Sequence, residues 1–134
     1  MIGDEERLLF ANDAFYAAFA SADIRLMNDL WAAAHPVSVI HPGAGIVVGR
    51  AEVLESWAAI LRDGEGFDIE HRDPIARLLG ETGIVLCHER VGTHHLIATN
   101  VFVRVEDEWQ IAHHQSGPAP VRAKQAKEER RPVH

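Results

Sequence analysis

The spacing of apolar residues changes once along the chain, near Gly66, and this change limits the folds that the sequence can adopt. Before Gly66, apolar residues recur mostly every three or four positions, which is the period of amphipathic helices. After it they alternate every second position, in runs bounded by glycines and a short acidic turn, as in strands. Helices followed by strands predict an α+β fold, with helices packed on one face of a strongly curved, mixed or antiparallel sheet.

Local signals divide both halves into elements. Asp23 is a suitable N-cap for a second helix, and the proline of "HP" at 35–36 ends it, because the residue before proline avoids the helical region. The predicted helices are 4–21, 23–34 and 50–62, and short strands are predicted at 37–42 and 46–48. Four longer strands are predicted at 67–79, 83–92, 94–105 and 109–117. A bent sheet under helices leaves a conical hollow, which is either filled with core or open as a pocket.

Composition restricts the classes of protein. The 134 residues predict one domain, with 1–117 as its body and 118–134 as a charged, flexible tail. A net charge of −7 disfavours nucleic acid and anionic membranes as partners. No apolar run approaches the ~18 residues needed to span a bilayer. The single cysteine, Cys87, and an N-terminus unlike a signal peptide favour the reducing cytoplasm.

The tail is basic although the chain is acidic. A frayed, solvated terminus is one interpretation, and contact with an acidic partner subunit is the other. The basic residues are Arg122, Lys124, Lys127, Arg130 and Arg131, set against Glu128 and Glu129.

Three segments together resemble a known family. They are "FYAAFASADIRLMNDLW" at 15–31, "VSVIHPGAGIVVGRAEVLESW" at 37–57 and "ATNVFVRVEDEWQIAHHQSGP" at 98–118. In this order they are similar to the NTF2-like superfamily and, within it, to the SnoaL-like, ketosteroid isomerase-like domains. That resemblance implies a cystatin-like cone and a homodimer formed through the sheet face. It does not fix an activity, because the superfamily hosts enzymes, assembly domains and proteins of unknown function.

Comparison with ketosteroid isomerases implies roles for particular residues. Their general base precedes a proline at the end of the first strand, which is the place of His41 in "VIHP". Their oxyanion-binding acid lies on the long strand, at the place of Asn100 in "ATNVF". Their helical tyrosine aligns with Phe15, and Tyr16 is one residue away, about 100° around the helix.

Strand alternation gives independent expectations. In "WQIAHHQS" the face of Trp109 and Ile111 is the more apolar, so His113 is expected inside and His114 outside. On strand 94–105 the all-valine face suggests core, which would place Asn100 outside, whereas the resemblance places it inside. A β-bulge could reconcile the two, and the choice stays open.

Four further residues are candidate pocket residues. Cys87 and Glu89 share a strand face, and Glu89 is either an acid–base partner of a histidine or simply exposed. Trp31 and Trp57 could wall a cavity and stack on a flat ligand, or belong to the core.

Metal and cofactor signals are weak. Adjacent histidines on a strand point to opposite faces, so each "HH" offers one inward ligand, although His41, His95 and His113 form a conceivable zinc set. We therefore expect no metal and no cofactor. Two functions remain: a His-based isomerase, cyclase or dehydratase acting on a small hydrophobic carbonyl compound, with His41, Asn100 and His113 as catalytic residues, or a non-catalytic ligand-binding or dimeric assembly domain.

Overall fold

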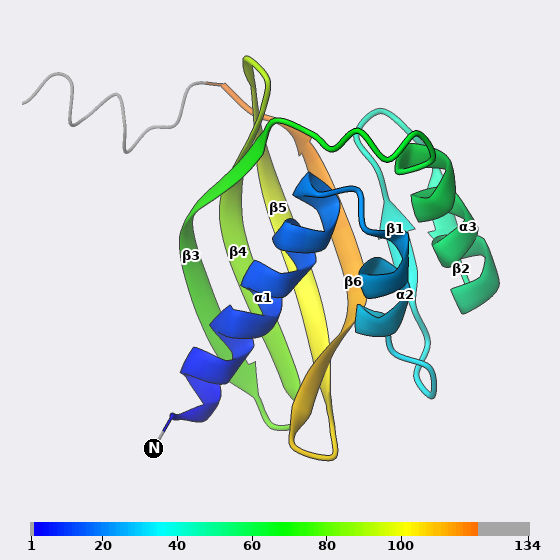
Figure 1. Ribbon diagram of the computed structural model, residues 1–134. Helices are drawn as coiled ribbons and strands as arrows, with labels where there is room; N and C mark the ends of the chain where they lie inside the picture. The colour runs from blue at the N-terminus through cyan, green and yellow to red at the C-terminus, as the bar shows by residue number, and fades with distance from the viewer. Residues whose placement is uncertain (1, 121–134) are drawn as a thin grey trace, which may run out of the picture.

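The structure is a computed structural model, and it describes residues 2–120 (Figure 1). Its helices are α1 (Asp4–Ala20), α2 (Ile24–Leu30) and α3 (Arg50–Ile60). Its strands are β1 (Ser38–Ile40), β2 (Ile46–Val48), β3 (Ile69–Leu79), β4 (Thr82–Val91), β5 (His94–Val105) and β6 (Glu108–Pro118). The element order is that predicted, and the tail from residue 121 lies outside the described residues, so its predicted flexibility stays a prediction.

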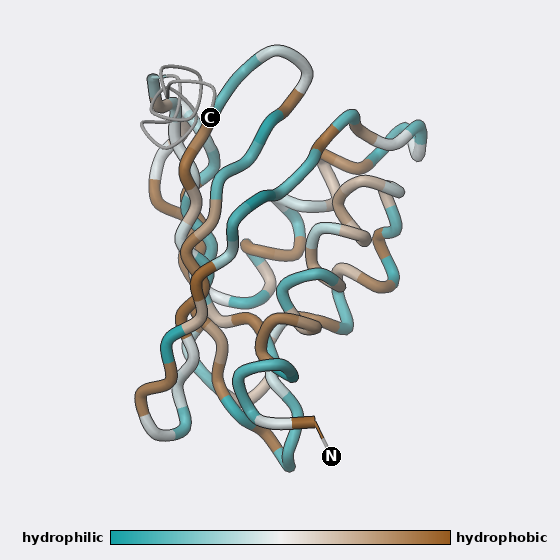
Figure 2. The backbone as a smooth tube through the Cα atoms, turned by 90° about the vertical axis from the view of Figure 1, so that its left-hand side faces the viewer, coloured by the Kyte–Doolittle hydropathy of each residue, from teal (hydrophilic) through white to brown (hydrophobic). Residues whose placement is uncertain are grey.

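The six strands form one sheet in the order β2-β1-β6-β5-β4-β3. β1 runs parallel to β6, and every other neighbouring pair is antiparallel, so the sheet is mixed. The helices lie on one side of this curved sheet, with α1 crossing it and α2 and α3 near β1 and β6 (Figures 1 and 2). The predicted α+β cone is confirmed. Its inner face, towards the helices, holds the core.

Helix α2 ends earlier than predicted. Asp23 caps its start as expected, its side chain accepting a bond from the Leu26 N–H at 3.0 Å. The helix stops at Leu30 because Trp31 is extended and forms a parallel bridge with Ile111 of β6. The Ala32 N–H then donates to the Ile111 carbonyl at 2.9 Å, so pairing with the sheet replaces the predicted last turn.

A β-bulge in β6 reverses the predicted orientation of its two histidines. Val101 pairs with His113 and Phe102 with Ile111, which leaves Ala112 as an extra residue. Side-chain alternation therefore shifts by one position after Ile111. His114 is 1% exposed and faces inward, so the prediction that His113 lines the interior is wrong.

Strand β5 settles the open question about Asn100. Its inner face carries Leu96, Ala98, Asn100 and Phe102, all buried, whereas Val101 and Val103 are only half-buried on the other face. The valine argument is therefore wrong and the placement implied by the resemblance is correct. No bulge in β5 is needed, because the extra residue belongs to β6.

Candidate functional site

Buried polar side chains from α1, β4, β5 and β6 meet on the inner face of the sheet. Tyr16 is their hub: its hydroxyl donates to Glu89 Oε2 at 2.5 Å and lies 3.3 Å from Cys87 Sγ. Glu89 is only 3% exposed, although it lies on a strand where exposure was the commoner expectation. We call this group the polar cluster; its members are Asn12, Tyr16, Cys87, Glu89, Asn100 and His114.

Asn100 joins the two halves of the polar cluster. Its Nδ2 donates to Asn12 Oδ1 at 2.9 Å and to the Tyr16 hydroxyl at 3.2 Å. Its Oδ1 lies 2.6 Å from His114 Nδ1. An amide oxygen can only accept, so the ring of His114 carries its proton on Nδ1 and leaves Nε2 with a lone pair.

Burial sets the protonation of these groups. It raises the pKa of Glu89, while the hydrogen bonds from Tyr16 and Ser116 act in the opposite direction. Burial and the neighbouring Glu89 also raise the pKa of Tyr16 far above its usual range, and burial raises that of Cys87 to about 11. A raised pKa favours the protonated form of the Glu89 carboxyl, and the Cys87 thiol stays protonated and unreactive at neutral pH.

His114 is a neutral imidazole. Burial, followed by the nearby His41 and His113, lowers its pKa to about 3. Its ring packs on Phe15 at 4.9 Å and on Trp57 at 5.8 Å between centroids. Its fixed tautomer makes it a hydrogen-bond acceptor at Nε2 across the physiological pH range.

His41 lies half-buried between strand β1 and helix α3. Its Nε2 is 3.0 Å from Ser56 Oγ, and the Ser56 hydroxyl donates to the Val53 carbonyl at 2.7 Å. Ser56 therefore accepts from the His41 Nε2–H, which leaves the lone pair on Nδ1. The His41 ring also packs edge-on against Trp57, with 4.8 Å between the ring centroids. Burial lowers the pKa of His41, so the ring is uncharged at pH 7 and its lone pair can accept a proton.

His71 of β3 connects the polar cluster to the surface. It is the register partner of Glu89, and its ring stacks on Tyr16 at 4.4 Å and 11°. Its Nε2 lies 2.8 Å from Asp13 Oδ1 of α1. A positive charge on His71 would favour the ionised form of Glu89.

A cavity of about 560 Å³ opens where the sheet and helices diverge. We call it the mouth pocket. Its described walls are mostly apolar, with polar side chains from the β4–β5 turn and the start of β5, and its volume suits a small organic ligand. The lining residues are Phe19, Pro42, Phe67, Val91, Thr93, His94, His95, Leu96, Pro118 and Ala119.

The mouth pocket adjoins the polar cluster along the strands. Val91 lies two residues beyond Glu89 on the same face of β4, and Leu96 is the register partner of Glu89 on β5. Pro42, the residue after His41, lines the pocket. His41 itself is not among the described residues that line it. Glu89 therefore lies one alternation step along β4 from the pocket wall formed by Val91.

Comparison with known proteins identifies the family of this chain. The family model described as "SnoaL-like domain" matches residues 9–121. The chain belongs to this family. A candidate dehydratase of the NTF2-like family from Streptomyces avermitilis is 31% identical to this SnoaL-like domain, with a TM-score of 0.81 over 88% of this chain and 97% of that one.

Three other proteins are also similar to this chain. A candidate calcium/calmodulin-dependent protein kinase type II association domain from Thiobacillus denitrificans is 28% identical, with a TM-score of 0.72 over 82% of this chain and 93% of that one. A candidate ketosteroid isomerase from Parabacteroides distasonis shares the fold at 14% identity and a TM-score of 0.70, over 89% of this chain and 90% of that one. The F-box protein SKIP8 of Arabidopsis thaliana is 25% identical over 111 residues, which are 81% of this chain. The SnoaL-like chain spans about half of that relative's length, 48%.

The structure brings together some of the predicted site residues and separates others. Tyr16, Cys87, Glu89 and Asn100 meet in the polar cluster, and Trp57 lies between His41 and His114. Phe15 packs edge-on against Tyr16 and Trp57. Two predicted residues lie elsewhere: Trp31 is buried beside β6, and His113 bonds to Ser38 Oγ at 2.7 Å.

Sequence reasoning missed Asn12, His71 and the inward orientation of His114. Asn12 lies one helical turn before Tyr16, so a polar i, i+4 pair on an apolar helix face could have revealed it. Thr93 was missed because a turn carries no periodic signal, and His94 was missed because it lies at the very start of its strand.

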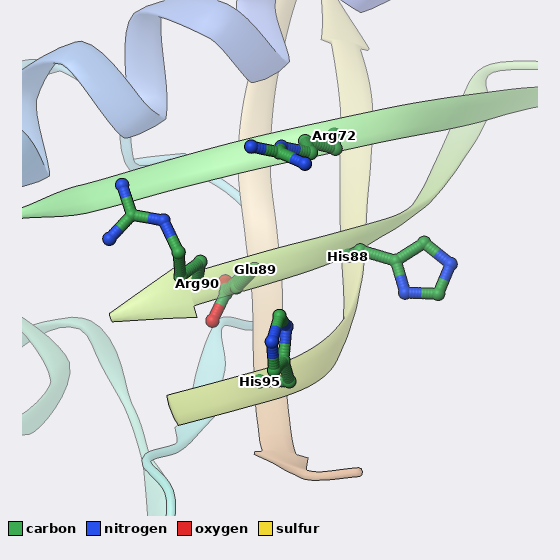
Figure 3. Close-up of a pocket in the computed structure, with 5 residues that line it drawn as sticks. All are labelled: Arg72, His88, Glu89, Arg90 and His95. Atoms are coloured by element: carbon green, nitrogen blue, oxygen red, sulfur yellow. The ribbon is translucent and has the colours of Figure 1, made fainter. Parts of the chain in front are cut away.

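The outer face of the sheet is different in character. Ile75, Leu86 and Ile97 are exposed there, around a shallow hollow of about 120 Å³. A second small hollow is lined by Arg72, His88, Glu89, Arg90 and His95 on β3, β4 and β5 (Figure 3).

In the described residues, no three His, Cys, Asp or Glu side chains are grouped closely enough to hold a metal ion, and none of the helices is both long and apolar enough to cross a membrane.

Proposed function

We propose that this SnoaL-like domain is an acid–base enzyme that moves a proton on a small hydrophobic carbonyl compound, as an isomerase, cyclase or dehydratase. The observation that carries the proposal is the buried, hydrogen-bonded Glu89–Tyr16 pair next to Val91 and Leu96, which line a mostly apolar pocket of about 560 Å³. Likeness to the Streptomyces candidate dehydratase supports it. The ligand is held by its apolar body and reacts at its carbonyl end.

His41 supplies the base in this proposal. Its Nδ1 lone pair takes the proton from the carbon next to the carbonyl, the C–H electron pair forms a C=C bond, and the carbonyl π pair moves onto oxygen to give an enolate. Glu89, whose raised pKa favours the protonated carboxyl, donates a hydrogen bond to that oxygen and keeps its proton. Protonated His41 then returns the proton to carbon, so atoms and charge balance.

Exchange of carbon-bound hydrogen tests the proposal without knowledge of the natural substrate. Butyrophenone and related aryl ketones are incubated in D₂O, and deuterium uptake next to the carbonyl is followed by NMR. The wild type should accelerate uptake, and His41→Gln should lose about 10²-fold or more of that rate. His35→Gln, which changes an exposed histidine, is the matched control and should keep the full rate. Equal rates with and without His41 would refute the proposal.

A dimeric assembly domain is the second candidate function. The exposed Ile75, Leu86 and Ile97 form an apolar patch on the outer face, which a monomer seldom leaves uncovered. Likeness to the Thiobacillus candidate association domain supports this candidate. The two functions are compatible, because one uses the inner face and the other the outer face.

A further inference from the structure

Polarity in the mouth pocket is divided between its two sides. The walls from α1, from the loop before β3 and from β6 are apolar, including Phe19, Phe67 and Pro118. The polar side chains among the described lining residues are Thr93 of the β4–β5 turn and His94 and His95 at the start of β5. A ligand in this pocket therefore has a preferred direction, with its apolar body on the walls and a polar end at the turn.

The polar side favours an anion. The chain carries 20 acidic against 13 basic residues, yet among the described residues no Asp or Glu lines the mouth pocket. Thr93, His94 and His95 each bring a hydrogen-bond donor, and no other described side chain bonds to them. His94 faces the mouth pocket alone, whereas His95 borders both this pocket and the hollow with Arg72 and Arg90. Donors at this end of the pocket suit an oxygen acceptor, and charge strengthens such bonds.

Two arginine side chains lie close to His95. His95 also lines the hollow that contains Arg72 and Arg90 (Figure 3). Arg90 donates to Asp68 and Glu70 at 3.2 Å, so its charge is largely compensated, and the turn itself has to supply the direct bonds. Arg72 also donates to Glu70, so both carboxylates are paired with guanidinium groups.

We propose that the mouth pocket selects carbonyl compounds that carry a carboxylate at the end opposite the reacting group. Thr93, His94 and His95 bind the carboxylate, the apolar walls hold the middle of the molecule, and the carbonyl end points inward to the polar cluster. The inward placement of the carbonyl rests on the function proposed above. The carboxylate preference does not, because binding alone reveals it.

Calorimetry with three matched probes tests the selection: benzoylpropionate, its methyl ester, and butyrophenone, which has a methyl group in place of the carboxyl. The wild type should bind benzoylpropionate at least about 10-fold more tightly than either neutral probe, which is a modest gain for charged hydrogen bonds. In the triple variant Thr93→Val/His94→Leu/His95→Leu, the preference for benzoylpropionate over the neutral probes should fall below about threefold. His94→Leu alone, at an exposed position, should lower it partly, and His35→Leu should leave it unchanged.

Failure of this inference can be told apart from failure of the proposed function. In His41→Gln the carboxylate preference should persist while hydrogen exchange is lost. Equal binding of the three probes to the wild type would overturn the inference, even if exchange occurs. A retained preference without any exchange would uphold the inference and refute the proposed enzyme. Thermal unfolding of each variant confirms that the turn substitutions leave the fold intact.

Discussion

Each face of strands β4 and β5 carries two residues of unexpected polarity. The inner face buries Glu89 and Asn100, whereas the outer face exposes Leu86 and Ile97. Burying polar groups costs free energy unless every group is bonded, and exposing apolar ones forfeits hydrophobic stabilisation. A sheet optimised for stability alone would do the opposite at these four positions. The proposed chemistry would account for the buried polar residues, and the proposed contact with a second copy would account for the exposed apolar ones.

The largest effect is expected at Asn100. Asn100→Leu leaves Asn12 Oδ1 and His114 Nδ1–H without their partner, and each unsatisfied buried group costs about 1–3 kcal/mol. We expect the free energy of unfolding to fall by about 3 kcal/mol in urea titrations. Thr99→Val, which alters the neighbouring outer-face residue, should change it by less than about 0.5 kcal/mol. Similar losses for the two variants would mean that the polar cluster is not a specially bonded unit.

His114 predicts an acid-dependent loss of stability. Its pKa is about 3 in the folded chain and ~6.5 when unfolded, so the unfolded chain binds the proton first as pH falls. Stability from this residue is complete above pH ~6.5 and is lost towards pH 3, by about 2 kcal/mol between pH 7 and 5. His114→Asn should remove this component of the pH dependence. NMR should show a neutral ring with its proton on Nδ1 at pH 5; a ring that titrates near 6.5 contradicts the burial.

Glu89 predicts the opposite pH dependence. Its raised pKa means that the unfolded chain releases the proton first as pH rises, so its contribution is most favourable below pH ~4.5 and weakens above it. Glu89→Gln keeps an acceptor for Tyr16 without a charge. Relative to the wild type, it should gain about 1.4 kcal/mol at high pH for each unit by which the pKa is raised. A difference in unfolding free energy that stays constant from pH 4 to 9 would refute the shift.

The smallest effect on the folded subunit is expected on the outer face. Ile97→Lys places a charge on an already exposed site, so monomer stability should change by less than about 0.5 kcal/mol. The same change should dissociate a dimer formed through the apolar patch, as seen by sedimentation velocity. Ile46→Lys, at an exposed position on the edge strand β2, is the control and should leave the assembly unchanged. A wild type that sediments as a monomer at all concentrations would remove the assembly proposal.

The sequence allowed the helices, the strands and their order to be predicted, because local periodicity and turn residues define them. It did not allow the facing of His113 and His114 to be predicted. That facing depends on Ala112 as an extra residue, and the shift exists only in the pairing of β6 with β5. Burial of Glu89 was equally hidden, since the residue that bonds to it, Tyr16, lies 73 positions away. Local pattern thus predicts the scaffold, whereas the site depends on register and on distant partners.

The central claim is that ligand binds on the inner side of the sheet, against the polar cluster. Intermolecular nuclear Overhauser effects between benzoylpropionate and methyl-labelled protein test it most directly. We expect cross-peaks to the Val91 and Leu96 methyls, together with a shift of the His41 ring signals. Cross-peaks confined to the Leu86 and Ile97 methyls on the outer face, with an unperturbed His41, would contradict it.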